Sequence, residues 1–315
     1  MRLAAAIQEY TDYKRSLGMV FRSDATILKA FLQELGDMGL NLISAPRVRS
    51  FLDGMHGPVT SYWFRKFSTL NRFFRYAVSR HYMDDQPLLP RSLPSAPARL
   101  TPYLFSVEEV RGLLRVPDSS YPPRSSIEPH SVRTLILLLY GTGVRISEAL
   151  RLTLSTVNLE EGLVEIRKTK FFKARLLPVG SDLKRILQDY YERQWSGRRH
   201  SLNSPFLCSR TYAPISIYAA DYVFESLRST AGVLRFDGGR YQPRLHDFRH
   251  TFAVTRLVTW YREGQNLQRL LPHLCTYLGH GHIDSTAHYL TLTKELLKEA
   301  SRCFERYALG EVQHG

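Results

Sequence analysis

Residues 141–148 read GTGVRISE and directly follow an apolar run that predicts a buried helix at about residues 130–140. The glycines of this stretch predict a turn, which places Arg145 at the start of the next helix. Backbone N–H groups at the start of a helix favour an anion, so an arginine there suits a phosphate group. Taken singly, Arg145 is explained as well by a structural ion pair with a residue such as Glu148.

A second stretch, RLHDFRHTF at residues 244–252, places three polar side chains on one face of an expected helix. His246, Arg249 and His250 follow the spacings i, i+3 and i+4, at which helical side chains are neighbours. A zinc site of the H-E-x-x-H kind is a weak interpretation, because aspartate and phenylalanine follow the first histidine. We therefore expect a polar site without a metal ion.

Two further stretches carry side chains that could take part in chemistry. The sequence LGH at residues 278–280 is followed by Tyr289, nine residues after His280. Earlier in the chain, LVEIRK and RLLPV flank the segment TKFFKA and predict a β-hairpin whose tip carries Lys170 and Lys173. Each of these signals is weak by itself, since a single tyrosine in such a stretch usually packs half-buried.

The composition is that of an ordinary folded protein with an excess of basic residues. Hydrophobic residues make up 43% and charged residues 23% of the 315, which argues against disordered, collagen-like and coiled-coil classes. The 43 basic and 29 acidic residues give a net charge of +14, which favours nucleic acid as the partner. Three scattered cysteines predict neither a disulfide framework nor a thiolate zinc site. No apolar run approaches the roughly 20 residues of a membrane span, and no secretory segment opens the sequence, so we expect a cytoplasmic protein.

A proline-rich stretch, residues 86–104, divides the chain into two expected domains. Its prolines exclude a helix and favour an extended tether. Residues 1–85 predict a helical domain, in which Ser23 and Ser44 are the candidate helix caps. Residues 105–315 predict mainly helices around the small β-hairpin, so the expected fold class is mainly α with a small sheet (α+β). The expected helices span about residues 2–17, 23–37, 44–54, 59–82, 106–115, 130–140, 181–194, 216–231, 244–261, 265–278 and 293–308.

The expected helix at residues 59–82 has one apolar face and one cationic face. No acidic residue interrupts the helix, which favours contact with DNA phosphates. The alternative interpretation is an ordinary solvated face. The basic residues of this face, our candidates for DNA binding, are Arg65, Lys66, Arg72, Arg75 and Arg80.

Together these motifs resemble the tyrosine recombinase family, also called phage integrases, which cut and rejoin DNA. The family pattern is an arginine in a G-x-R-x-S-E turn, a lysine on a β-hairpin, H-x-x-R on a helix, L-G-H, and a tyrosine nine residues after that histidine. The pattern covers about residues 135–295, and alignment through RLLP selects Lys170, with Lys173 as the next candidate. The matching positions, in the family order, are Arg145, Lys170, His246, Arg249, His280 and Tyr289.

The resemblance implies an architecture and a set of partners. It implies an α-helical, SAM-like core-binding domain over residues 1–85, a linker over 86–104, and a catalytic domain with a C-terminal helix over 105–315. The implied partners are double-stranded DNA with specific recombination sites and a tetramer of the chain on that DNA, without a membrane. Whether sister recombinases or accessory proteins take part is left open. The long interval between the H-x-x-R and L-G-H motifs resembles recombinases encoded by transposons and other mobile elements.

The resemblance also implies a mechanism without metal or nucleotide cofactor. Tyr289 would attack the phosphorus to form a 3′-phosphotyrosyl link, with His246 as the acceptor of its proton. Arg145 and Arg249 would stabilise the charge on the phosphate. Lys170 would protonate the departing 5′-oxygen, and His280 would hydrogen-bond the phosphate. The alternatives are a type IB topoisomerase, a non-catalytic DNA-binding regulator, and a metal-dependent hydrolase suggested by the histidines.

Overall fold

The computed structural model describes residues 1–54, 59–87, 94, 101–167, 174–239 and 241–279. They form two compact units, one within residues 1–99 and one within residues 100–279, and each is described by itself. None of the described helices combines the length and the apolar character needed to cross a bilayer. Several predictions fall outside the described residues, namely those on Lys170, Lys173, His280, Tyr289 and the helix at 293–308.

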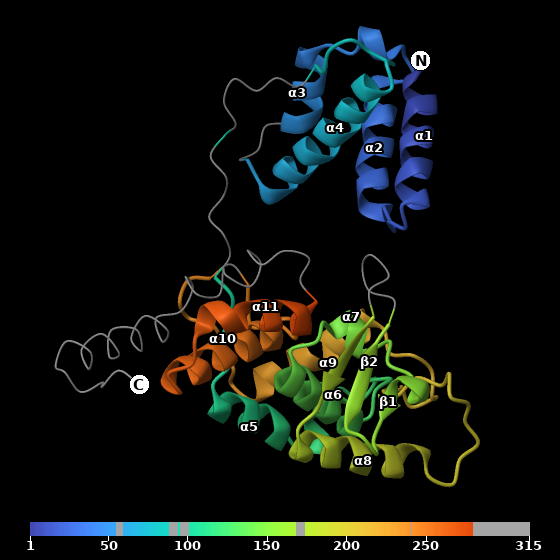
Figure 1. Cartoon of the computed structure of the whole chain (residues 1–315). Helices are drawn as coiled ribbons and strands as arrows, with labels where there is room; N and C mark the ends of the chain where they lie inside the picture. Colours follow the sequence, from blue (N-terminus) through green and yellow to red (C-terminus); the bar gives the residue numbers. More distant parts are fainter. Residues whose placement is uncertain (55–58, 88–93, 95–100, 168–173, 240, 280–315) are drawn as a thin grey trace, which may run out of the picture. The chain divides into compact units, whose positions relative to one another are not determined.

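The first unit is a bundle of four helices, as the sequence predicts (Figure 1). Its core is aromatic: Phe31, Phe73 and Phe74 have no exposed surface. Large rings bury much apolar area per residue, which lets a small bundle form a stable core. The helices are α1 (Leu3–Ser16), α2 (Arg22–Leu35), α3 (Ala45–Asp53) and α4 (Ser61–Ser79), with a short 3₁₀ turn at Leu40–Leu42.

The predicted helix caps of this unit need correction. Ser23 is not a cap, because α2 already begins at Arg22 and Phe21 occupies the N-cap position in a left-handed conformation. Ser44 is the N-cap residue of α3, but its side chain makes no capping hydrogen bond. The side chain of Thr60 caps α4, since it accepts a hydrogen bond from the Trp63 backbone N–H, and no cap was predicted for this helix.

The second unit is mainly helical with a small antiparallel sheet, which confirms the predicted fold class. Its helices are α5 (Val107–Arg115), α6 (Pro129–Thr142), α7 (Ile146–Ala149), α8 (Ser181–Trp195), α9 (Ile217–Thr230), α10 (Asp247–Arg262) and α11 (Leu267–Leu278), with 3₁₀ turns at Asp118–Ser120 and Leu154–Thr156. Its strands are β1 (Val157–Asn158), β2 (Leu163–Ile166) and β3 (Arg175–Pro178). The predicted hairpin is β2 and β3, whereas β1 is only two residues long and carries no periodic signal.

The sheet has the order β1-β2-β3 and buries one face. Val164, Ile166 and Leu177 are buried, in line with the alternation of side chains along a strand. Ile166 is the register partner of Arg175, so Arg175 is the first residue of β3 to pair with β2. The pairing of β2 with β3 therefore begins at Arg175.

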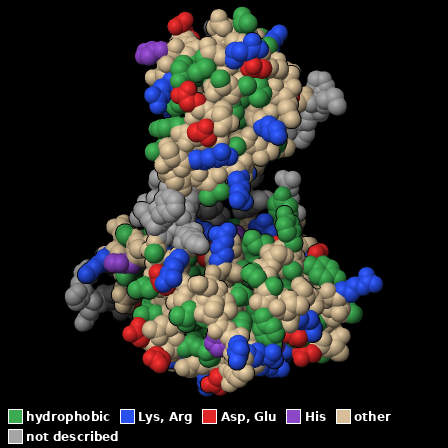
Figure 2. Space-filling model, turned by 90° about the vertical axis from the view of Figure 1, so that its right-hand side faces the viewer, with side chains coloured by type: hydrophobic (Ala, Val, Ile, Leu, Met, Phe, Trp, Pro, Cys, Tyr) green, Lys and Arg blue, Asp and Glu red, His purple; other side chains and the backbone are tan. Residues whose placement is uncertain are grey.

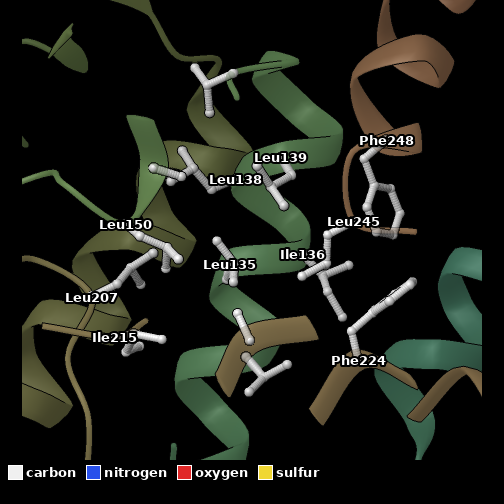
Figure 3. Packing of buried hydrophobic residues seen from close by; sticks show 14 of the residues in the cluster. Leu135, Ile136, Leu138, Leu139, Leu150, Leu207, Ile215, Phe224, Leu245 and Phe248 are labelled. Atoms are coloured by element: carbon white, nitrogen blue, oxygen red, sulfur yellow. The ribbon is translucent and has the colours of Figure 1, made fainter. Parts of the chain in front are cut away.

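Helix α6 lies in the core of the second unit. Four of its side chains, Leu135, Ile136, Leu138 and Leu139, are at most 1% exposed. Figure 3 shows these side chains pointing in two directions, toward Leu150 and Leu207 on one side and toward Phe224, Leu245 and Phe248 on the other. The core therefore covers α6 on two of its sides. Packing thus fixes the end of α6, and with it the start of the turn that leads to Arg145.

The residue that follows the proline-rich stretch, Phe105, packs against α10. The Phe105 ring stacks on Phe248, with centroids 4.2 Å apart and planes 12° apart. The Phe105 backbone N–H donates to Thr251 Oγ1 at 3.0 Å. A capping box of Ser106 with Glu109 starts α5 directly after this contact.

Candidate active site

The turn between α6 and α7 depends on a glycine. Gly143 has φ +62°, and a Cβ at this position would lie 2.5 Å from the Phe252 ring. A residue with a side chain would therefore be strained and would also clash with α10. The tight turn makes Arg145 the N-cap residue of α7, where the sequence places it.

Arg145 is held on two sides. Its Nη1 donates to Glu148 Oε1 at 2.9 Å, and its Nη2 donates to the backbone carbonyl of Gly279 at 3.0 Å. The ion pair with Glu148, which the sequence offered as one interpretation, is thus present. The side chain keeps 35% of its exposure, so the guanidinium is still accessible from solvent. An arginine that is both fixed and accessible can serve as an anion ligand.

Arg249 is almost fully enclosed, with 2% exposure. Its Nη1 donates to the carbonyl of Gly143 at 2.9 Å, and its Nη2 donates to the carbonyl of Leu278 at 2.7 Å. Arg249 therefore connects the α6–α7 turn to the end of α11. A guanidinium remains charged at any accessible pH, so its position adds fixed positive charge here.

The two histidines of the H-D-F-R-H segment lie together at the start of α10. His246 is the N-cap residue and is exposed, whereas His250 is half-buried. Their ring centroids are 5.1 Å apart and the ring planes are nearly perpendicular, at 88°. The predicted shared face is confirmed for this pair, whereas the Arg249 side chain is buried and binds the carbonyls of Gly143 and Leu278.

Both imidazoles favour the neutral form. The pKa of His246 is lowered, chiefly because the surrounding protein desolvates the ring and further because Arg249 adds positive charge. Burial lowers the pKa of His250 to about 4, with a contribution from His246. Asp247 opposes both shifts, but it is itself buried and accepts hydrogen bonds from Arg244. A neutral imidazole can accept a proton near neutral pH.

Glu148 and Arg175 form a buried ion pair that sequence reasoning missed. The sequence motif RLLP, which contains Arg175, predicts the position of the hairpin lysine but no role for Arg175 itself. Arg175 Nη2 lies 2.7 Å from Glu148 Oε2, and the two side chains are 10% and 8% exposed. Burial alone would raise the pKa of Glu148, but hydrogen bonding to Arg175 and the charges of Arg175 and Arg145 hold it below its ordinary value. The sequence feature that could have indicated this ion pair is the arginine at the start of the apolar strand RLLP.

Three arginines meet at the C-terminal end of α11. The consecutive carbonyls of Tyr277, Leu278 and Gly279 accept hydrogen bonds from the three side chains. The last carbonyls of a helix lack partners within the helix and carry partial negative charge, so they attract cations. The donors are Arg175 Nε at 2.8 Å, Arg249 Nη2 at 2.7 Å and Arg145 Nη2 at 3.0 Å.

In the first unit, most basic residues predicted to bind DNA have protein partners. Arg65 and Arg72 both approach Asp24, at 4.0 and 3.1 Å. Lys66 Nζ donates to the Phe51 carbonyl at 2.6 Å and lies over the Phe51 ring, which is a structural role. Arg80 lies over the Tyr76 ring, and Arg75 is exposed. The sequence pattern did not reveal that α2 supplies an acidic residue to this face.

Within the described part of the chain, no group of three histidine, cysteine or acidic residues could hold a metal ion. Figure 2 shows lysine and arginine side chains scattered over the visible face of each unit, with acidic side chains among them. The described site is therefore a cluster of guanidinium groups beside neutral imidazoles.

Residues 105–295 match the model of the phage integrase family. The chain belongs to this family. It is thus a tyrosine recombinase, a site-specific DNA recombinase. The integrase/recombinase y4rB of Sinorhizobium fredii is 34% identical over 307 residues, covering 96% of each protein. The tyrosine recombinase XerC of Bacillus licheniformis is 27% identical over 302 residues, covering 93% of this chain and 91% of its own.

The fold is also that of solved integrases. The Tn1549 transposon integrase in complex with transposon right end DNA superimposes with a TM-score of 0.70 at 14% identity, covering 98% of this chain and 100% of that one. A lambda integrase dimer bound to a COC′ core site gives a TM-score of 0.68 at 18% identity, covering 93% and 97%. At these identities the likeness concerns the fold of the chain.

Proposed function

We propose that this recombinase cleaves and rejoins DNA through a 3′-phosphotyrosyl intermediate formed by Tyr289. The observation that carries the proposal is the anchoring of Arg145 and Arg249 on the adjacent carbonyls of Gly279 and Leu278. These carbonyls belong to the segment that leads directly into His280 and, nine residues later, Tyr289. The permanent charges are therefore fixed at the end of α11, which lies ten residues before Tyr289 in the sequence.

The residues divide the chemistry among them. The Tyr289 phenol oxygen forms a bond to phosphorus as the bond to the 5′-oxygen breaks, and the reverse step by another 5′-hydroxyl rejoins the strand. Arg145 and Arg249 stabilise the negative charge that builds on the nonbridging oxygens. His246, held neutral, accepts the tyrosine proton, Lys170 protonates the departing oxygen, and His280 hydrogen-bonds the phosphate.

We further propose that the enzyme serves a mobile element and acts as a tetramer on DNA. The fold likeness to a transposon integrase supports the first part. The net charge of +14 supports DNA as the partner, and one solved lambda integrase with this fold is a tetramer bound to a Holliday junction. The first unit would then be a core-binding domain that contacts DNA through α4, with Arg75 among its exposed cations.

Replacement of the nucleophile tests this proposal directly. Recombination sites are first selected from a pool of random duplexes, and a nicked duplex carrying the site is then incubated with the protein. We expect Tyr289→Phe to abolish the covalent protein–DNA adduct on a denaturing gel, because phenylalanine has no oxygen to attack phosphorus. Gel-shift binding should stay within a few fold of the unchanged protein.

The control is Tyr218→Phe, which removes the hydroxyl of a tyrosine that is 89% exposed. It should leave the adduct unchanged, because accessibility alone does not activate a phenol. An undiminished adduct with Tyr289→Phe would refute the assignment. Strand exchange between two duplexes, rather than relaxation of plasmid lacking the site, distinguishes a recombinase from a type IB topoisomerase.

A further inference from the structure

Arg175 is a buried charge whose presence stability does not explain. Its side chain is 10% exposed, and it faces Glu148, which is 8% exposed. Replacing a buried ion pair by well-packed apolar side chains is often neutral or stabilising for a protein. A buried pair beside a reactive centre therefore calls for a role in the geometry of that centre.

Glu148 is shared between two arginines. Its Oε1 accepts from Arg145 Nη1 at 2.9 Å and from Arg175 Nη1 at 3.2 Å. Its Oε2 accepts from the Arg145 backbone N–H at 3.1 Å and from Arg175 Nη2 at 2.7 Å. The planar guanidinium of Arg175 fixes the position of the Glu148 carboxylate by two hydrogen bonds. Because the same carboxylate accepts from Arg145 Nη1, Arg175 also influences where that nitrogen lies.

Arg175 also fixes the second support of Arg145. Its Nε donates to the Tyr277 carbonyl at 2.8 Å, two residues before the carbonyl that binds Arg145 Nη2. The contact is close, since a Cβ on Gly279 would lie 2.7 Å from Arg175 Nη1. Both groups that hold Arg145, the Glu148 carboxylate and the end of α11, are thus held in turn by Arg175.

We propose that Arg175 is a positioning residue of recombination, which aims the Arg145 guanidinium at the scissile phosphate by bracing Glu148 and the end of α11. The inference rests on the proposed role of Arg145 as the ligand of that phosphate. Arg175 itself need not touch DNA. A misplacement of about 1 Å in such a group costs about 100-fold in rate.

A substrate with a neutral scissile group separates positioning from general damage. A methylphosphonate carries a methyl group in place of one charged nonbridging oxygen, so less negative charge needs stabilisation as the tyrosine attacks. The variants are Arg175→Lys, which keeps the charge without the bidentate fork, and Arg175→Met. Both should lose about 100-fold in cleavage of the phosphodiester. On the methylphosphonate both should react at a rate close to that of the unchanged enzyme.

Two further variants make the result decisive. Arg210→Met breaks the ion pair with Glu128, 2.7 Å long in the same unit, and should react normally on both substrates. Arg145→Ala should be rescued by the methylphosphonate. If it is not rescued, the proposed role of Arg145 fails and the positioning inference falls with it. If Arg145→Ala is rescued but the Arg175 variants are not, only the positioning inference is overturned.

The folded state is checked separately by melting temperature and gel shift. Arg175→Met leaves the Glu148 charge buried without this partner, and it could prevent folding. The Arg175→Lys variant retains the charge, so a folded protein is available for the comparison. Full activity of Arg175→Lys on the phosphodiester would overturn the inference, because a lysine cannot reproduce the planar contact.

Discussion

At the scale of single residues, the site depends on which groups are charged. Arg145, Arg175 and Arg249 keep their charge, whereas His246 and His250 are surrounded by protein that lowers their pKa. The Arg249 guanidinium contributes to both shifts, because a second positive charge nearby is unfavourable. The same cluster therefore supplies fixed cations and neutral bases. This combination suits the attack of a phenol on a phosphate.

The pH dependence of stability should report the state of His250. Its pKa is about 4 in the folded protein against 6.5 ordinarily, so between these values the unfolded chain binds a proton that the folded chain does not. The stability contribution is therefore complete above pH 6.5 and is lost as pH falls toward 4. The slope is at most about 1.4 kcal/mol per pH unit.

Denaturant unfolding at several pH values measures this slope. His250→Gln should flatten the curve in this window, because glutamine does not titrate. The matched control, His273→Gln, alters an exposed histidine of the same unit and should leave the slope in place. An unchanged slope with His250→Gln would show that the imidazole is not held neutral by its surroundings.

At the scale of elements, the end of α11 organises the arginines. A helix leaves its last carbonyls without intrahelical partners, and here three guanidinium groups bind three consecutive carbonyls. The arginines provide hydrogen-bond donors for the last carbonyls of α11, and these carbonyls in turn fix the positions of the arginines. Gly279 makes this arrangement possible, because it takes φ +68° and leaves room for Arg175.

Two glycines allow this arrangement to be tested with a matched pair. Gly279 and Gly264 both have φ +68°, but an added Cβ meets Arg175 at Gly279 and meets nothing within 4 Å at Gly264. Each alanine substitution should cost about 1–2 kcal/mol of stability through its backbone. Only Gly279→Ala should also displace Arg175 and reduce cleavage, by about 100-fold.

Cleavage of the nicked duplex and the melting temperature together check this prediction. The two alanine variants should have similar melting temperatures and different cleavage rates. Equal cleavage rates for Gly279→Ala and Gly264→Ala would mean that the close approach of Arg175 has no influence on the reaction.

At the scale of the whole molecule, the excess of positive charge governs DNA binding. The net charge is +14, and basic side chains are scattered over the visible face of each unit (Figure 2). Binding to phosphates releases counterions, so the affinity falls with salt by a logarithmic slope of about −0.9 per phosphate. Arginines already paired with acidic residues should contribute less to this slope than an exposed arginine.

Affinity measured over a range of salt concentrations tests the assignment of α4. Arg75→Ala should weaken binding and reduce the slope by about one, as expected for the loss of a phosphate contact. Arg2→Ala is the control on the same unit, because Arg2 is paired with Asp37 at 2.7 Å. If Arg75→Ala leaves the salt dependence of the affinity unchanged, Arg75 does not belong to the DNA interface. If the affinity of the unchanged protein does not depend on salt, the charge argument as a whole is wrong.

Local sequence patterns were enough to predict the helices and the hairpin that the structure describes, the fold class and the family. The signals were the apolar run of α6, the two segments that flank the hairpin, and the motifs of fixed length around Arg145 and His246. The positions of Lys170, His280 and Tyr289 in the reaction stay predictions that rest on the family pattern. The cap at Ser23 failed because α2 begins one residue earlier, a difference that local propensity does not resolve.

Only the tertiary structure decided which partners the charged groups have. Asp24 lies on α2 yet pairs with arginines of α4, and Arg175 lies at the start of β3 yet binds Glu148 of α7 and a carbonyl of α11. These contacts join residues that are 27 to 102 positions apart. No local pattern encodes them, because a hydrogen bond between distant segments depends on how the whole core packs.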